Sequence, residues 1–115
     1  MYKFNYAEVL NETGQSGRED ECAAIEQSIE MLRVAEAKGR RSREAIEALF
    51  YLRRLWSLLL EDLGSPENDL PQSLRADLIS IGIWMMREAE NIRTGNSENF
   101  KGLIDVSAII LAGLR

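Results

Sequence analysis

The sequence lacks the side chains on which most enzyme and metal chemistry depends. Its 115 residues contain no histidine and only one cysteine, Cys22. These absences exclude a Cys/His zinc site, a histidine general base and an intramolecular disulfide. The chain also has no Ser-x-x-Lys or Gly-x-Ser-x-Gly motif and no phosphate-binding glycine-rich loop. We therefore expect a protein that is not an enzyme and that uses no cofactor or metal, with Cys22 as a small buried or half-buried residue.

Positive charge is also scarce. Lysine and arginine number 14 against 19 acidic residues, which gives a net charge of -5. An excess of acid disfavours a DNA or RNA binder, because phosphate contacts need clustered cations, and it favours a protein partner. The one basic cluster runs from Lys38 to Arg43 and is continued by Arg53 and Arg54. We interpret it mainly as a helix end followed by solvated arginines, with a direct RNA contact as the alternative.

Long apolar runs are missing as well. No stretch reaches the roughly 18 apolar residues that a membrane-spanning helix needs. The first residues, Met1 to Tyr6, lack the apolar region of a signal peptide. We therefore expect a cytoplasmic protein that does not cross a membrane.

Apolar residues recur at steps of three and four, the period of an amphipathic helix, and no segment shows sustained alternation. This pattern predicts helices at about 17–38, 43–63, 71–93 and 97–112, preceded by an N-terminal arm at 1–16. Short connections between helices make neighbours antiparallel. The prediction is an all-α fold, a single-domain bundle of four helices with short connections.

Several local signals define the expected helix ends. Ser16 and Glu19 fit a capping box at the start of the first helix, and Ser42 fits the N-cap of the second. Gly39 fits a left-handed C-cap. Gly82 lies in the middle of a predicted helix, where it costs about 1 kcal/mol relative to alanine. We expect it to allow close packing of a neighbouring helix.

The predicted helix at 43–63 is apolar around most of its circumference. Such a helix is either central in a bundle or keeps a second face for a partner. Trp56 and Trp84 fit the core, although an aromatic side chain that lines a partner groove is the alternative. Spare apolar surface fits either the binding of another protein's amphipathic helix or a homodimer.

Three segments, in this order and spacing, resemble one protein family. They are Tyr51-Leu52-Arg53-Arg54-Leu55-Trp56, Leu70-Pro71-Gln72-Ser73-Leu74-Arg75-Ala76-Asp77-Leu78, and Leu103-Ile104-Asp105-Val106-Ser107 with the ending Ile109-Ile110-Leu111-Ala112-Gly113-Leu114. Together they resemble the flagellar biosynthesis regulator FlaF family of alphaproteobacteria. The sequence departs from that pattern at Leu52 and Ser107, where family members tend to carry asparagine. A polar contact between the two helices that carry these positions is therefore not carried over.

The resemblance implies a cytoplasmic, non-enzymatic protein needed for flagellin production, secretion or filament assembly, acting alongside a second regulator, FlbT. Our first hypothesis is an adaptor or chaperone that holds a helical terminal segment of flagellin. The alternatives are a post-transcriptional regulator of flagellin mRNA and a structural dimerisation module. The candidate partner-binding residues are Arg53, Arg54, Leu55, Trp56, Leu58 and Trp84.

Overall fold

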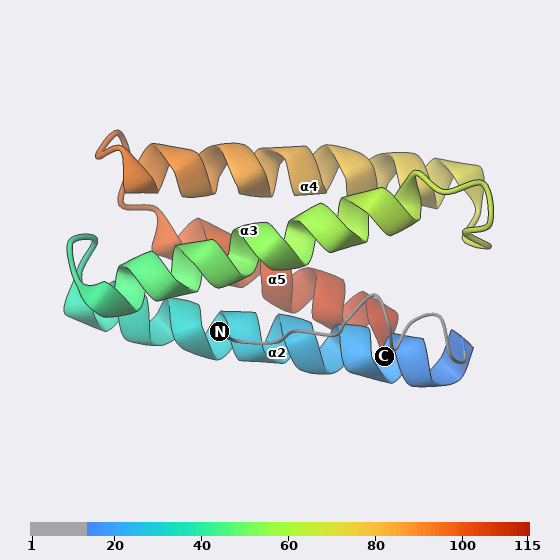
Figure 1. Cartoon of the computed structure of the whole chain (residues 1–115), viewed down its shortest axis with the longest axis horizontal. Coiled ribbons are helices and arrows are strands. Elements are labelled where there is room, and N and C mark those ends of the chain that lie inside the picture. Colours follow the sequence, from blue (N-terminus) through green and yellow to red (C-terminus); the bar gives the residue numbers. More distant parts are fainter. Residues whose placement is uncertain (1–13) are drawn as a thin grey trace.

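The computed structural model describes residues 14–115, which form a bundle of four helices. They are α2 (Gly14–Lys38), α3 (Arg43–Leu63), α4 (Gln72–Arg93) and α5 (Phe100–Leu114). Each helix runs antiparallel to the one before it, and short loops join them at the two ends of the bundle (Figure 1). The predicted all-α fold of four helices with short connections is confirmed.

The start of the first helix differs from the prediction. Helix α2 begins at Gly14, so Ser16 lies inside the helix and the predicted capping box at Ser16 is wrong. Once a buried face has nucleated a helix, each further residue adds a hydrogen bond at small cost, so polar residues can extend it. The predicted N-terminal arm therefore loses residues 14–16, and its remainder, 1–13, lies outside the described residues.

The last helix also begins later than predicted. Helix α5 begins at Phe100, and its N-cap is Asn99, whose Oδ1 accepts a hydrogen bond from the backbone N of Gly102 over 2.9 Å. Sequence patterns place Asn96 and Ser97 equally well at such a position, and only the path of the loop decides between them. Gly95, with φ of 88°, makes the turn that follows α4.

The predicted connection between the first two helices is confirmed. Gly39 has φ of 99°, the left-handed conformation expected of a C-cap glycine. Ser42 is the N-cap of α3, and its Oγ accepts a hydrogen bond from the backbone N of Ala45 over 3.0 Å. The same Oγ donates to the carbonyl oxygen of Gly39 over 2.7 Å, which ties the cap to the turn.

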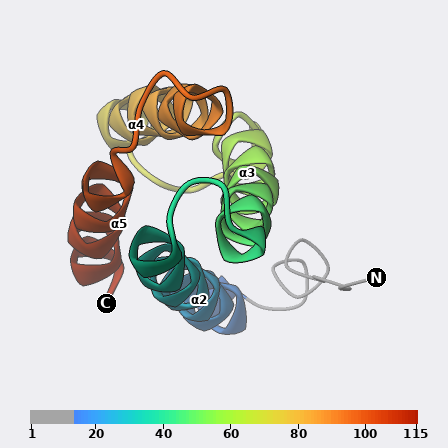
Figure 2. The ribbon, with the colours of Figure 1, turned by 90° about the vertical axis from the view of Figure 1, so that its left-hand side faces the viewer.

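The four helices surround a common core (Figure 2). Helix α2 packs against α3 and α5, and α4 packs against α3 but touches α5 only slightly. The largest completely buried apolar side chains come from all four helices: Leu32, Leu52, Leu55, Met85, Ile92 and Leu103. Cys22 is buried, as expected. The positions that depart from the family pattern, Leu52 and Ser107, are both buried.

Helices α3 and α4 approach each other closely at Gly82. A Cβ added there would lie 2.7 Å from Cε3 of Trp56 and 2.8 Å from Cδ2 of Leu60. Real Cβ atoms do not come so close to another heavy atom, so only glycine fits at this crossing. The expectation that Gly82 allows close helix packing is confirmed, and the contact fixes the indole of Trp56 between the two helices.

Candidate functional site

The structure divides the candidate partner-binding residues of α3 between its surface and its core. Arg53 and Arg54 are exposed on the outer side of the helix. Leu55 and Trp56 are only 1% and 3% exposed, so neither side chain lies on the surface that carries Arg53 and Arg54, and the expectation that the four residues face one partner together is corrected. Successive helical residues are about 100° apart, and the two that follow Arg54 turn inward. Leu58 is half-buried against the core.

Trp84 lies on α4 and is 37% exposed. Its neighbours Gly82 and Met85 are buried whereas Trp84 is not, so the expectation that Trp84 belongs to the core is corrected. Trp84 does not line the groove that Arg53 and Arg54 border. The six candidate residues therefore do not form one surface. Of the six, Arg53 and Arg54 are exposed and adjacent in the chain, so they define the surface on which a partner could bind.

Arg53 and Arg54 border a shallow apolar groove between α3 and α4. The groove has a volume of about 460 Å³ and is lined by Arg40, Ile46, Leu49, Phe50, Arg53, Arg54, Ser57, Met86 and Arg93. Ile46 and Phe50, one turn apart on α3, are 65% and 64% exposed. We call this region the arginine-rimmed surface. Large apolar side chains that are so exposed next to each other are typical of a binding site.

Three of the four arginines on this surface contact α4 or its following loop. Nη1 of Arg53 lies 3.4 Å from Oε1 of Glu90, and Arg93 forms an ion pair with the same carboxylate. The hydrogen bond from Arg93 lowers the pKa of Glu90 below its ordinary value, and the charge of Arg53 acts in the same direction. The guanidinium of Arg40 lies against Gly95. The apolar groove is thus bordered by four arginines and one carboxylate.

The importance of Ile46 and Phe50 was not evident from the sequence. Both contribute to the broad apolar circumference of the helix at 43–63, and the sequence pattern does not distinguish them from buried neighbours such as Leu55. The available signal was their spacing of four residues outside the main stripe, directly before two arginines. Which of two apolar stripes is covered depends on where α4 crosses α3.

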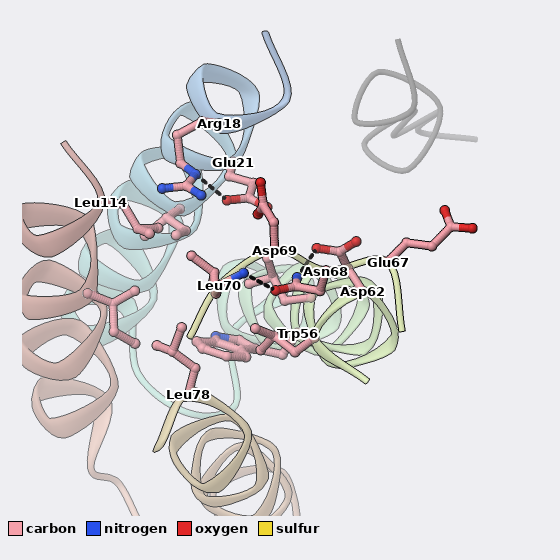
Figure 3. A pocket seen from close by; sticks show the side chains of 14 residues that line it. Arg18, Glu21, Trp56, Asp62, Glu67, Asn68, Asp69, Leu70, Leu78 and Leu114 are labelled. Carbon is pink, nitrogen blue, oxygen red and sulfur yellow. Dashed lines mark hydrogen bonds and ion pairs between the residues drawn. The ribbon is translucent and has the colours of Figure 1, made fainter. Parts of the chain in front are cut away.

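A second hollow lies at the opposite end of α3 (Figure 3). It has a volume of about 230 Å³ and lies where the start of α2, the α3–α4 loop and the end of α5 meet; we call it the Trp56 cleft. Its lining residues are Arg18, Glu21, Ile25, Trp56, Leu59, Asp62, Leu63, Glu67, Asn68, Asp69, Leu70, Leu78, Ile110 and Leu114. It shares no residue with the arginine-rimmed surface.

Hydrogen bonds fix the loop beside the Trp56 cleft. Nδ2 of Asn68 donates to Oδ2 of Asp62 over 3.0 Å, and the backbone N of Leu70 donates to Oδ1 of Asn68 over 3.0 Å. The amide of Asn68 therefore connects Asp62, near the end of α3, to Leu70, which lies shortly before α4. Figure 3 shows the indole of Trp56 between Leu70 and Leu78, with the carboxylates above it.

Clusters that could bind a metal ion are absent from the part of the chain that the structure describes: within residues 14–115, no group of three or more Cys, Asp or Glu side chains is placed to hold one. Among the four described helices, none is long and apolar enough to cross a membrane. The arrangement suits the binding of a polypeptide: apolar side chains for contact area and charged side chains at the border.

Comparison with known proteins identifies the family. No curated protein and no solved structure matches the chain significantly. The model of one family, described as flagellar protein FlaF, matches residues 2–114, which is nearly the whole chain. That description names a flagellar protein and no enzymatic activity. The resemblance seen in the sequence is thereby confirmed: the chain belongs to the FlaF family of flagellar proteins.

Proposed function

We propose that the protein is a cytoplasmic adaptor that binds flagellin through the arginine-rimmed surface and protects a helical terminal segment before export. The family membership supports a flagellar role. The observation that carries the proposal is the exposure of Ile46 and Phe50 beside the cations Arg53 and Arg54. If flagellin bound to the adaptor cannot contact other molecules, the adaptor would also regulate flagellin, together with FlbT.

The chemistry of the surface defines the segment that it binds. An amphipathic helix places apolar residues at three- and four-residue steps into a groove. Phe50 and Met86 come from α3 and α4, so a helix lying along the groove would contact both. Carboxylates that flank the apolar residues of the segment would pair with Arg54 and Arg40 at the border. Rim charges mainly affect the association rate and the dependence on salt.

The test is copurification with flagellin followed by light scattering to weigh the complex. We expect a complex of defined stoichiometry at micromolar concentrations. Phe50→Ser should weaken binding about tenfold or more, because it removes an aromatic contact from the centre of the surface. Ile109→Ser is the matched control, since Ile109 is 71% exposed on α5, away from the groove. The absence of a complex, or equal loss with both variants, would reject the proposal.

A second candidate is direct binding of flagellin mRNA. The observation in its favour is that Arg40, Arg53, Arg54 and Arg93 lie around an exposed aromatic side chain, Phe50. Bases stack on aromatic rings, and arginines pair with phosphates. Binding to flagellin mRNA should then weaken steeply between low and moderate salt, and Arg54→Gln should reduce the salt dependence. No detectable affinity for the RNA at low salt excludes this candidate.

The arginine-rimmed surface also suits a structural dimerisation module. A second copy would then cover Ile46 and Phe50. Sedimentation at increasing protein concentration separates this alternative from the adaptor. A protein that stays monomeric at high concentration is not a dimerisation module.

A further inference from the structure

We propose that the Trp56 cleft is a second docking site, and that it takes a peptide segment of opposite charge from the one expected at the arginine-rimmed surface. Its occupant is a segment of another protein in which a bulky apolar residue lies next to lysine or arginine. This inference does not depend on flagellin binding, because the two sites share no residue.

The floor of the cleft is apolar and preformed. Trp56 is held from behind by Gly82, and its ring faces Leu70 and Leu78 (Figure 3). Leu114 from the last turn of α5 lines the cleft as well, and Leu70, Leu78 and Leu114 all remain half-buried. An apolar side chain that enters between them would remove their remaining surface from water. This is the main source of affinity in such a pocket.

The border of the cleft is acidic. Glu21, Asp62, Glu67 and Asp69 line it together with one cation, Arg18. Arg18 is engaged with Glu21, since Nε of the arginine lies 3.5 Å from Oε1 of the glutamate. Figure 3 shows Asp62 and Asp69 above the indole and Glu67 pointing away from it. A segment with a cation beside its apolar residue complements this border, whereas an acidic segment is repelled.

The surrounding helices explain why the cleft stays open. Helix α4 has no buried side chain before Gly82, and it contacts α5 only slightly. Its first half therefore diverges from the end of α5, which leaves Leu78 and Leu114 on facing sides of a gap (Figures 1 and 3). The cleft lies at the end of the bundle opposite the α4–α5 loop.

The probe for the test is a synthetic ten-residue peptide with two leucines and one phenylalanine at helical spacing, flanked by four lysines. Its matched partner has glutamate in place of every lysine. Binding is measured with the full chain carrying Trp84→Phe. The sequence has two tryptophans, so this substitution leaves Trp56 as the only one. Emission from Trp56 then reports occupancy of the cleft itself.

We expect the lysine peptide to change Trp56 emission and to bind about tenfold or more tightly than the glutamate peptide. Asp69→Asn should weaken its binding about two- to fivefold, as expected for one exposed ion pair. Leu78→Ala should weaken it about fivefold or more, because apolar contact is lost. Glu98→Gln is the control, since it removes one exposed charge in the loop at the other end of the bundle. Arg54→Gln should leave the affinity unchanged.

Four outcomes would overturn the inference. The first is equal binding of the two peptides, and the second is binding without a change in Trp56 emission. The third is a gain of tenfold or more in peptide affinity with Phe4→Ser, which would make the chain's own N-terminal residues the occupant. The fourth is a concentration-dependent dimer that dissociates with Asp69→Asn, which would make a second copy the occupant. Loss of flagellin binding alone would reject the proposed function and leave this inference standing.

Discussion

Ser97, in the loop before α5, donates a hydrogen bond from its Oγ to Oε2 of Glu88 on α4 over 2.9 Å. Asn91 donates from Nδ2 to the other carboxylate oxygen over 3.2 Å. Both hydrogen bonds lower the pKa of Glu88 below its ordinary value of 4.5, and the bond from Asn91 has the largest effect. Partial burial of the carboxylate acts in the opposite direction. The carboxylate thus connects α4 to the loop that leads into α5, a helix that α4 otherwise touches only slightly.

The lowered pKa of Glu88 predicts a pH-dependent contribution to stability. A carboxyl group with a depressed pKa stabilises the folded state above its ordinary pKa of 4.5, and this contribution disappears as the pH falls through the lower folded value. Glu88→Gln should therefore lower the free energy of unfolding at neutral pH by less than about 1 kcal/mol. In strong acid the variant and the parent should be equally stable.

Urea unfolding of both proteins at neutral pH and at about pH 3 measures the effect. Glu61→Gln, an exposed substitution on α3, is the control and should differ little from the parent at either pH. A Glu88→Gln variant whose loss of stability is the same at both pH values would contradict the assignment.

Gly82→Ala should destabilise the protein, although alanine favours a helix. The added methyl group would lie 2.7 Å from the ring of Trp56, which cannot move away because it is buried. We expect a loss of about 1–3 kcal/mol, against a gain of up to about 1 kcal/mol in helix propensity. Gly113→Ala meets no atom within 4 Å and is the matched control. Thermal unfolding of both variants should show a lower midpoint for Gly82→Ala only.

Leu55→Ala and Arg54→Ala should differ strongly in their effect on stability. Leu55 is buried, so its truncation should lower the free energy of unfolding by about 2–5 kcal/mol. Arg54 is exposed, so its truncation should change stability by less than about 0.5 kcal/mol. Chemical denaturation gives both values. Equal stability of the two variants would show that Leu55 is not a core residue.

Ser42→Ala should weaken the start of α3. The hydroxyl accepts a hydrogen bond from the backbone N of Ala45 and donates one to the carbonyl oxygen of Gly39. Loss of such an N-cap costs about 1 kcal/mol. Ser57→Ala, at an exposed position inside the same helix, is the control and should not destabilise. Urea unfolding midpoints that fall equally for both would argue against the cap.

The sequence predicted the fold well because the pattern of apolar residues is a local property of each helix. The bounds of α3 agree with the prediction, since Ser42 and the apolar residues that follow it define the helix locally. Errors occurred at Ser16, which was predicted as a cap, and at the start of the last helix, which was predicted at 97; several polar residues compete for the cap position at both places. The path of the neighbouring chain decides which residue caps the helix. Local sequence patterns carry no information about that path.

The candidate site was harder to predict for a related reason. Arg53 and Arg54 are exposed as their charges require. For apolar residues, however, burial depends on the partner helix: Leu55 is covered, whereas Phe50 is not. The Trp56 cleft was not predicted, because it combines α2, α3, α4 and α5 with residues of the α3–α4 loop. Only the tertiary arrangement brings those residues together.

The weak contact between α4 and α5 has a consequence for the order in which the bundle opens. Backbone amides exchange with solvent through local openings whose cost falls where few apolar contacts are broken. The first half of α4, before Gly82, buries no side chain and is anchored only by half-buried residues such as Leu78. Its amides should therefore exchange well before those around Leu52 and Leu103. A ligand in the Trp56 cleft would slow that exchange, because it supplies the neighbour that α5 does not.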